Sequence, residues 1–243
     1  MLKKVSIIIP VFNEEKLIVK TIESVIGADS LGLHKEIIIV DDGSTDDTVK
    51  NVKAQMTHDK LDNKTTSFIF IELKKNQGKG AALKAGFKKA TGDIFMVQDA
   101  DSEYNVHDYP SLLTPFLKEN ALVVYGSRNK KRENFHNRYS YLIYYWGGLV
   151  LTWIINLLFG LHLTDQAAGY KLFSNKVKSL LLQPKENRFS YEVAITALLA
   201  QNRHTFVEVP IHYKPRTMKE GKKISAIDFI ASVFVAVKYA VGG

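Results

Sequence analysis

The sequence of 243 residues contains no cysteine, which excludes disulfide bonds and metal sites that depend on thiolate ligands. It also lacks internal repeats and low-complexity tracts, and its longest polar stretch, residues 57–66, is interpreted as a surface loop. Residues 1–4 lead directly into a strand-like segment without the apolar stretch and cleavage site of a signal peptide, so no such leader is expected. The lack of cysteine is compatible with a reducing cytoplasm.

The sequence carries an excess of positive charge, with 33 Lys and Arg against 25 Asp and Glu and a formal net charge of +8. This balance suggests an anionic partner, such as a phosphate ligand, a nucleic acid or an anionic membrane face. A hydrophobic content of 46% is enough for one sizeable core, or for a core with a small appendage.

Short β-branched runs alternate with segments of helical periodicity in the first half of the chain. Asn13 and Ser44 are predicted to start two helices, and a third is expected over residues 80–90. The predicted strands cover residues 5–10, 36–40, 67–73, 93–98 and 121–125. This alternation predicts an α/β fold with a mostly parallel sheet, helices on both faces and ligands at the carboxyl ends of the strands.

Acidic residues follow three of these strands, in segments 10–15, 41–46 and 99–103. Clustered carboxylates repel one another, and a divalent cation with oxygen ligands relieves that repulsion. Asp99 and Asp101 are two residues apart in an extended segment, so both can reach one ion, and Glu103 comes next on the same side. A single D-x-D is more often a solvated turn, but its position after an apolar strand favours a metal site.

A glycine-rich turn, residues 76–80, follows the third strand. Its glycines allow close approach of the backbone to a phosphate, and Lys79 adds a positive charge near the helix start. The turn does not satisfy the Walker A pattern, and no G-x-G-x-x-G follows the first strand. Asp41 is interpreted as a contact to a base or ribose rather than as a helix cap.

Eight segments spread over nearly the whole chain carry a resemblance to a known family. They are VSIIIPVFNEE (5–15), EIIIVDDGSTDDT (36–48), KNQGKGAALKAGFKKATGD (75–93), QDAD (98–101), VVYGSR (123–128), TDQAAGYKLF (164–173), RFSYEVAITALLA (188–200) and VEVPIHYKPRTMKEGKKI (207–224). In combination they resemble family 2 glycosyltransferases, and within these the dolichol- or polyprenyl-phosphate sugar synthases.

This resemblance implies a Rossmann-like, GT-A type fold and an inverting transfer from a UDP- or GDP-sugar to a polyprenyl or dolichyl phosphate. It also implies Mg²⁺ or Mn²⁺, held by Asp99, Asp101 and Glu103, although relatives often carry Gln at the third position. The residues implied to bind the donor are Pro10, Phe12, Glu14, Asp41, Asp42, Gly78, Lys79, Asp99 and Ala100. The QAAGYK segment departs from many relatives, which leaves the contacts to the sugar open.

The second half contains an uncharged stretch, residues 141–161, that is long enough to span a membrane. Its Gly147-Gly148 pair, Asn156 and aromatic residues favour an interfacial position instead, with a buried core helix as the alternative. Residues 226–241 are also mostly apolar and are expected either to lie at the membrane surface or to lead into spans outside this sequence. We therefore expect a nucleotide-sugar-binding half (1–130) and an acceptor-binding half (131–243) in one catalytic domain, peripheral at the cytoplasmic membrane face.

Basic residues surround the uncharged stretch and are suited to an acceptor phosphate. The resemblance implies Arg128, Arg138 and Arg216 in that role, with Lys222 as a weaker candidate. Asp165 is interpreted as orienting the sugar, assisting catalysis or capping the next element, because an ionised phosphate acceptor needs no strong general base. Asp101, Asp165 and Arg128 form the predicted catalytic set, and Glu192 is another residue that can face the pocket.

Three alternatives remain at this point. The first is a glycosyltransferase with a saccharide or protein acceptor, which needs a base and therefore depends on Asp165. The second, a basic nucleic-acid-binding module, is disfavoured because the acidic strand ends repel phosphate and no recognition helix or RNP motif is present. The third is a membrane-docking protein without catalytic activity.

Overall fold

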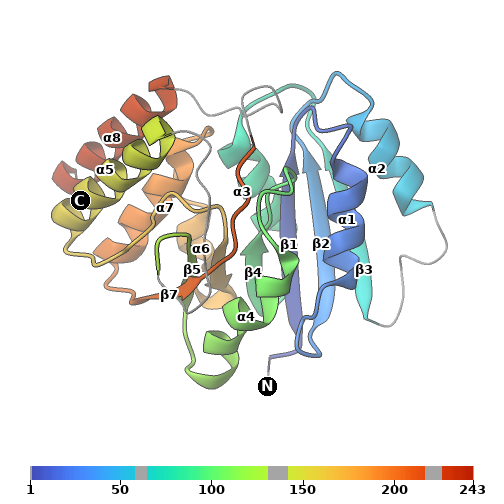
Figure 1. Ribbon diagram of the computed structural model, residues 1–243, viewed down its shortest axis with the longest axis horizontal. Coiled ribbons are helices and arrows are strands. Elements are labelled where there is room, and N and C mark those ends of the chain that lie inside the picture. Colours follow the sequence, from blue (N-terminus) through green and yellow to red (C-terminus); the bar gives the residue numbers. More distant parts are fainter. Residues whose placement is uncertain (1, 58–64, 131–141, 217–225, 243) are drawn as a thin grey trace.

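The computed structural model describes residues 2–57, 65–130, 142–216 and 226–242. A central sheet is covered by helices on both faces, and a separate group of helices lies beside one edge of it (Figure 1). Arg138 and Lys222, predicted to bind the acceptor phosphate, lie outside the described residues.

The sheet has seven strands in the order β3-β2-β1-β4-β6-β5-β7. The strands are β1 (Lys4–Val11), β2 (His34–Asp41), β3 (Thr66–Glu72), β4 (Ile94–Val97), β5 (Val123–Ser127), β6 (Lys171–Ser174) and β7 (Phe206–Pro210). Only β6 is antiparallel to its neighbours, so the prediction of a mostly parallel sheet is confirmed. All five predicted strands are present, and β6 and β7 come from the second half of the chain. Because β6 lies between β4 and β5, both halves build one sheet.

The helices α1 to α8 vary widely in length. They are α1 (Ile18–Gly27), α2 (Thr48–Met56), α3 (Lys79–Lys89), α4 (Tyr109–Lys118), α5 (Leu142–Phe159), α6 (Lys178–Leu181), α7 (Ser190–Gln201) and α8 (Ala226–Val241), with 3₁₀ turns η1 (Val106–Asp108) and η2 (Asn175–Val177). The third predicted helix therefore starts one residue earlier than expected, at Lys79.

Alternation of side chains along the strands divides the core into two layers. Ile7 and Ile9 of β1 pack with α1, α2 and α4 on one face. Ile8 packs with α3, α6 and α7 on the other. A third cluster joins α5 and α8 to the outer side of α7, and these three helices stand together beyond the β7 edge in Figure 1. The sheet edge that carries β7 is thus connected to a second helical layer.

The first two helix starts differ from the predictions. Asn13 has a φ of +48° and does not cap α1, which begins at Ile18. Instead Asn13 Oδ1 accepts a hydrogen bond from Thr45 N at 2.8 Å, and Asn13 N donates to Ser44 Oγ at 2.9 Å. Ser44 likewise does not start α2, which begins at Thr48. The two polar residues connect the loops after β1 and β2 to each other, which explains why neither caps a helix.

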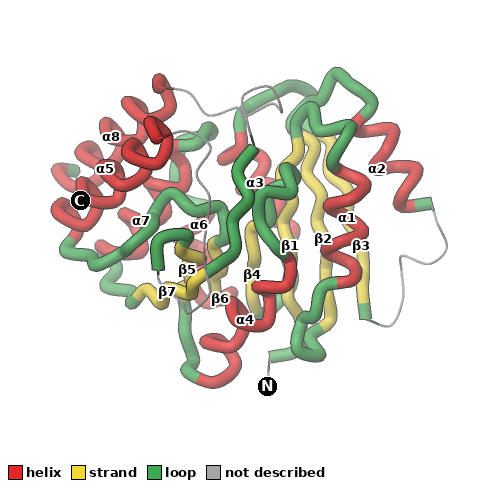
Figure 2. Tube along the Cα trace, viewed as in Figure 1, coloured by secondary structure: helices red, strands yellow, loops and turns green. Residues whose placement is uncertain are grey.

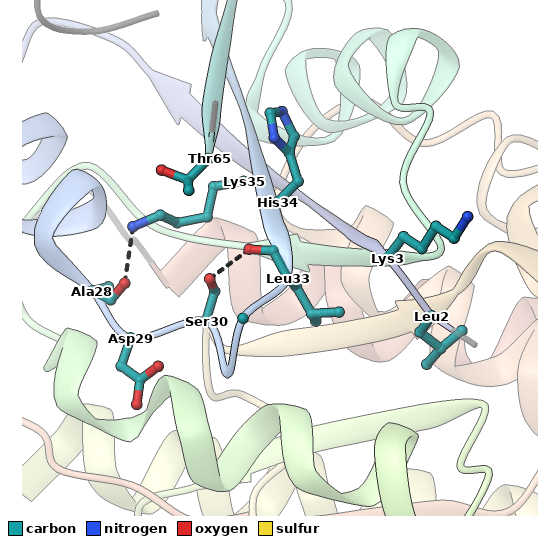
Figure 3. Close-up of a pocket in the computed structure, with 10 residues that line it drawn as sticks. Leu2, Lys3, Ala28, Asp29, Ser30, Leu33, His34, Lys35 and Thr65 are labelled. Carbon is teal, nitrogen blue, oxygen red and sulfur yellow. Dashed lines mark hydrogen bonds between the residues drawn. The ribbon is translucent and has the colours of Figure 1, made fainter. Parts of the chain in front are cut away.

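A hollow at the amino end of the strands is formed by Leu2 and Lys3 of the N-terminal segment, the α1–β2 loop and the first residues of β2 (Figure 3). Lys35 points into the end of α1, where its Nζ donates to the carbonyls of Ala28 at 2.9 Å and Val25 at 3.3 Å. Lys35 therefore caps the end of α1 in this hollow. The hollow lies at the opposite end of the strands from the acidic residues, as the course of the strands in Figure 2 shows.

A buried carboxylate, Glu36, connects β2 to β1 and to the start of β4. Ser6 Oγ and both the N and Oγ1 of Thr91 donate hydrogen bonds to it, and Lys4 Nζ lies 3.7 Å away. Burial alone would raise the pKa of Glu36, but these hydrogen bonds and Lys4 outweigh it and lower the pKa below 4.5. The ionised form is therefore the one that the fold stabilises.

We predict that Glu36→Gln lowers the free energy of unfolding by about 1–3 kcal/mol at pH 7, because donors of a buried network lose their charged acceptor. The contribution is present above pH 4.5 and is lost as the pH falls through the lower folded-state pKa. Urea unfolding between pH 7 and pH 3 should therefore show the two proteins converge in acid. The exposed Glu23→Gln serves as control, with a change below about 0.5 kcal/mol; a constant difference at all pH values would contradict this account.

Candidate active site

The three acidic strand ends meet at the carboxyl edge of the sheet, as predicted, because β1, β2 and β4 run parallel. Asp41 is the last residue of β2, Asp42 follows it, and both are buried. Asp99, Asp101 and Glu103 follow β4, with side chains exposed by 17%, 20% and 8%. The site is thus a partly buried group of carboxylates on the strand ends.

Asp42 holds the glycine-rich turn in place. Its Oδ1 accepts from Gln77 N at 2.8 Å and its Oδ2 from Gly78 N at 2.7 Å. Burial raises the pKa of Asp42, and these two hydrogen bonds oppose the rise. Asp42 therefore positions the turn that leads to Lys79.

The glycines of this turn have a packing role that the sequence did not indicate. Gly78 has a φ of +103°, and a Cβ there would lie 2.5 Å from the carbonyl oxygen of Asn187. A Cβ at Gly80 would lie 2.4 Å from Tyr191 Cβ. Both positions therefore need glycine for the turn to pack against the start of α7. The prediction that the glycines serve close approach to a phosphate stays untested.

Lys79, the first residue of α3, lies between two carboxylates. Its Nζ is 2.7 Å from Asp99 Oδ1 and 3.4 Å from Glu192 Oε1 on α7. Burial alone would lower the pKa of Lys79, but Asp99 and Glu192 together raise it above its ordinary value. Lys79 is therefore positively charged at neutral pH.

Arg216 lies among the remaining carboxylates of the site. Its guanidinium is 3.1 Å from Glu14 Oε2, 3.3 Å from Asp101 Oδ2 and 3.6 Å from Glu103 Oε1. Glu103 also accepts hydrogen bonds from Tyr213 Oη at 2.7 Å and from Arg216 N at 2.9 Å. The segment after β7 is thus joined to the strand ends of β1 and β4.

The neighbouring carboxylates affect the pKa of Asp101. Burial and then the neighbouring Asp99 and Glu103 raise the pKa of Asp101 to about 7, against the opposing effect of Arg216. In the part of the chain that the structure describes, no group of three or more carboxylates or histidines is arranged to hold a metal ion. The donor set consists of oxygen atoms on neighbouring loops, which is the chemistry that Mg²⁺ and Mn²⁺ prefer.

Arg128 and Asp165 form a second, separate pair. Asp165 is 1% exposed, and its two oxygens accept from Arg128 Nε and Nη2, each at 2.7 Å, while Oδ2 also accepts from Arg128 N at 2.9 Å. The guanidinium lies over the Tyr213 ring, 5.1 Å from its centroid. The geometry of Asp165 is therefore that of a residue that fixes Arg128.

The other residues predicted to bind the donor lie at the same edge. Pro10 is near the end of β1, and Phe12 follows that strand. The carbonyl of Ala100 accepts from Thr21 Oγ1 at 3.0 Å, which fixes the turn between Asp99 and Asp101 to α1.

Sequence reasoning missed Gly169, whose neighbours define the position of Asp99. A Cβ on Gly169 would lie 2.2 Å from Asp99 Oδ2 and 2.8 Å from Tyr104 Cε2, and Gly169 N donates to Tyr104 Oη at 2.8 Å. It also missed Tyr213 and the buried Lys171. All three lie in segments that carried the resemblance, but nothing in the sequence indicated which side chains of those segments face the carboxylates.

Comparison with known proteins identifies the family to which the chain belongs. The model of the family described as Glycosyl transferase family 2 matches residues 6–180. The chain belongs to glycosyltransferase family 2. Membership of an enzyme family decides in favour of the enzyme over the two non-enzyme alternatives.

Two curated relatives cover most of the chain. A UDP-N-acetylglucosamine–dolichyl-phosphate N-acetylglucosaminyltransferase of Methanococcus voltae is 31% identical over 91% of both chains. An undecaprenyl-phosphate 4-deoxy-4-formamido-L-arabinose transferase of Salmonella paratyphi A is 28% identical over 91% of this chain, which spans 63% of that relative's length.

Among solved structures, glucosyl-3-phosphoglycerate synthase of Mycobacterium tuberculosis in complex with Mn²⁺, UDP and phosphoglyceric acid superposes with a TM-score of 0.71. The superposition covers 98% of this chain and 78% of that one at 18% identity. The likeness shows the fold, which is the GT-A fold that the sequence predicted.

We predict that Gly169→Ala lowers the rate of sugar transfer about 100-fold or more, because the new methyl displaces the Asp99 carboxylate. The measurement is the initial rate of transfer, together with thermal unfolding to verify that the variant is folded. Gly27→Ala is the matched control, since nothing lies within 4 Å of a Cβ at that position. A folded Gly169→Ala protein with wild-type activity would show that the position of Asp99 is not critical.

Proposed function

We propose that the protein transfers a sugar, with inversion, from a UDP- or GDP-sugar to a polyprenyl or dolichyl phosphate at the membrane surface. One observation carries this proposal: Tyr213 connects a carboxylate cluster that suits a metal diphosphate to Arg128, an arginine fixed by the buried Asp165. The Tyr213 hydroxyl donates to Glu103, and its ring lies against the Arg128 guanidinium. The carboxylate cluster fits a donor, and Arg128 fits an anionic acceptor.

The donor is assigned to the strand ends of β1, β2 and β4. Asp41 Oδ1 is buried and has no hydrogen-bond partner among the described residues. It is therefore suited to accept a hydrogen bond from an N–H or O–H group of the nucleotide base or ribose. Pro10, Phe12 and Glu14 complete this side of the site, and Lys79 supports the diphosphate. The name of the Methanococcus relative supports a UDP-sugar.

A Mg²⁺ or Mn²⁺ ion is assigned to Asp99 and Asp101, which would hold it together with the donor diphosphate. Glu103 is a weaker candidate ligand, because it already accepts hydrogen bonds from Tyr213 and Arg216. The oxygen donors fit such an ion, and Asp99 and Glu103 add to burial in raising the pKa of Asp101, which is the repulsion that a cation would relieve. When bound, the ion supplies stabilisation of the charge that develops on the leaving diphosphate. Lys79 contributes to the same stabilisation from the start of α3.

The acceptor phosphate is assigned to Arg128 and Arg216, with Arg138 and Lys222 as further candidates outside the described residues. Asp165 positions Arg128, since both of its oxygens already accept from that guanidinium. A carboxylate in this arrangement is unsuited to deprotonate a hydroxyl. An ionised phosphate needs no such base, and this favours a phosphate acceptor over a saccharide or protein acceptor.

In the proposed reaction, a phosphate oxygen of the acceptor attacks the anomeric carbon in line with the leaving nucleoside diphosphate. The bond to the acceptor oxygen forms as the bond to the diphosphate oxygen breaks, which inverts the anomeric centre. Arg128 and Arg216 hold the attacking phosphate in position, and this placement is the main contribution of the acceptor half.

The membrane is assigned to the outer face of α5 and α8. None of the helices that the structure describes combines the length and the hydropathy needed to cross a membrane. Leu151 and Ile155 of α5 are buried against α7 and α8. The opposite side exposes large apolar residues: Trp146, Val150, Trp153, Leu157 and Leu158 on α5, and Ile227, Ile230, Phe234, Val237 and Val241 on α8.

This outer face supports an interfacial position for α5, with its inner side serving as core. Tryptophan prefers the headgroup level, and the net charge of +8 suits the anionic cytoplasmic leaflet.

The experiment that tests the proposed function incubates the protein with polyprenyl phosphate, Mn²⁺ and each of a set of UDP- and GDP-sugars, and detects lipid-linked product by mass spectrometry. We expect product with one donor and loss of product in excess EDTA. In Asp101→Ala the rate of product formation should fall about 1,000-fold or more, because an electrostatic stabiliser of the leaving group is removed.

Asp47→Ala is the control, since Asp47 is exposed and pairs only with Lys50 among the ion pairs described. Full activity of Asp101→Ala or of the EDTA-treated protein would overturn the metal assignment. Product on a saccharide or peptide, but not on a lipid phosphate, would overturn the acceptor assignment.

We further predict that Trp153→Glu and Phe234→Glu each lower binding to phosphatidylglycerol vesicles about tenfold or more, because an exposed aromatic that would enter the bilayer surface is replaced by a charge. Vesicle sedimentation measures the effect. Transfer to a short, water-soluble isoprenyl phosphate should be unchanged. Leu31→Glu is the control, since Leu31 is 40% exposed but lies in the α1–β2 loop. Equal loss in all three variants would contradict a specific membrane face.

A further inference from the structure

We propose that Glu192 is a positioning residue that takes Lys79 from Asp99 when a divalent ion enters the site. This inference rests on the metal assignment of the proposed function. It concerns a charge that the proposed reaction does not use, since Glu192 lies on α7 and is not one of the strand-end carboxylates.

The first observation is the unequal sharing of Lys79. Its Nζ lies 2.7 Å from Asp99 Oδ1, which is a short charge-assisted hydrogen bond, and 3.4 Å from Glu192 Oε1, which is longer than such a bond. Glu192 Oε1 is buried and lacks a hydrogen-bond partner among the described residues. A displacement of Lys79 Nζ by about 0.6 Å would give that oxygen a normal charge-assisted hydrogen bond.

The second observation is the surroundings of Asp99. Its Oδ2 lies against Gly169, where a Cβ would be only 2.2 Å away, and its Oδ1 is bonded to Lys79. An ion that binds Oδ1 therefore competes with Lys79 for this oxygen. The repulsion between the ion and the ammonium group acts in the same direction.

The third observation is what holds Glu192 where it is. Lys171 Nζ lies 3.7 Å from the same Oε1, donates to the carbonyl of Ala168 and sits over the Tyr125 ring at 5.0 Å from its centroid. Lys171 is 1% exposed and has no access to solvent counterions. Glu192 Oε1 is thus near two lysines, of which Lys171 is held by a backbone carbonyl.

These four groups form two positive and two negative charges in a partly buried row. Movement of Lys79 from one carboxylate to the other conserves this balance, and it releases one oxygen of Asp99. Lys79 also stays at the amino end of α3, close to where the diphosphate is assigned. Glu192 therefore keeps Lys79 available for the leaving group while Asp99 serves the ion.

The test is Mn²⁺ binding, measured by electron paramagnetic resonance on the full chain, without nucleotide and with saturating UDP. Glu192→Gln keeps the shape but removes the charge that receives Lys79, so we expect the Mn²⁺ dissociation constant to rise about tenfold. In a Lys79→Met background the same substitution should raise it less than about threefold, because there is no lysine to relocate. Lys79→Met alone should bind Mn²⁺ more tightly than the wild type in the absence of UDP.

Two further variants keep the test decisive. Glu186 lies just before α7, and its carboxylate pairs with Lys238 at 2.8 Å. Glu186→Gln removes this carboxylate and should leave Mn²⁺ binding unchanged. Lys171→Met/Glu192→Gln removes both charges together, so it replaces Glu192→Gln if the single variant leaves Lys171 unbalanced and fails to fold. Thermal unfolding of each variant verifies the fold.

An equal loss of Mn²⁺ affinity in the wild-type and Lys79→Met backgrounds would overturn the proposal, because Glu192 would then act independently of Lys79. Unchanged affinity in Glu192→Gln would also overturn it, while the metal assignment would stand. Absence of Mn²⁺ binding by the wild type, with or without UDP, would instead overturn the metal assignment and this inference with it.

Discussion

The mutual repulsion of carboxylates at one edge of the sheet is the constraint on which the rest of the site depends. Parallel strands bring the ends of β1, β2 and β4 together, and each end carries acidic residues. The structure balances them with cations from other elements, Lys79 of α3 and Arg216 after β7. A divalent ion bound to a diphosphate would compete with these cations for the same oxygens. Catalysis in this account therefore begins with an exchange of charge partners.

The same constraint connects the two halves of the chain. Arg216 and Tyr213 reach Glu103 from the segment after β7, and Gly169 packs against Asp99 from the segment before β6. The second half of the chain thus supplies residues that contact the strand-end carboxylates, and its strand β6 lies between β4 and β5. In the proposed function this shared sheet is what brings donor and acceptor together.

The fold class and the acidic edge were predictable because they depend on local patterns, namely apolar runs of strand length and polar residues at their ends. β6 was missed because four buried residues carry too little periodicity to separate a strand from a helix. The helix starts at Asn13 and Ser44 were wrong because each polar side chain bonds the other loop, which is a contact between residues 31 or more positions apart. Gly169 and Lys171 depend on such contacts too, whereas Glu192 was named from the sequence as a residue that can face the pocket. Their positions follow from packing, which a single sequence does not display.

The most direct test of the central claim is a crystal structure with UDP and Mn²⁺, with the ion located by its anomalous scattering. The account predicts one Mn²⁺ peak in contact with carboxylate oxygens of Asp99 and Asp101, with Lys79 Nζ moved from Asp99 toward Glu192 and the diphosphate. A Mn²⁺ peak elsewhere, or a Lys79–Asp99 bond that persists at 2.7 Å beside bound Mn²⁺ and UDP, would contradict it.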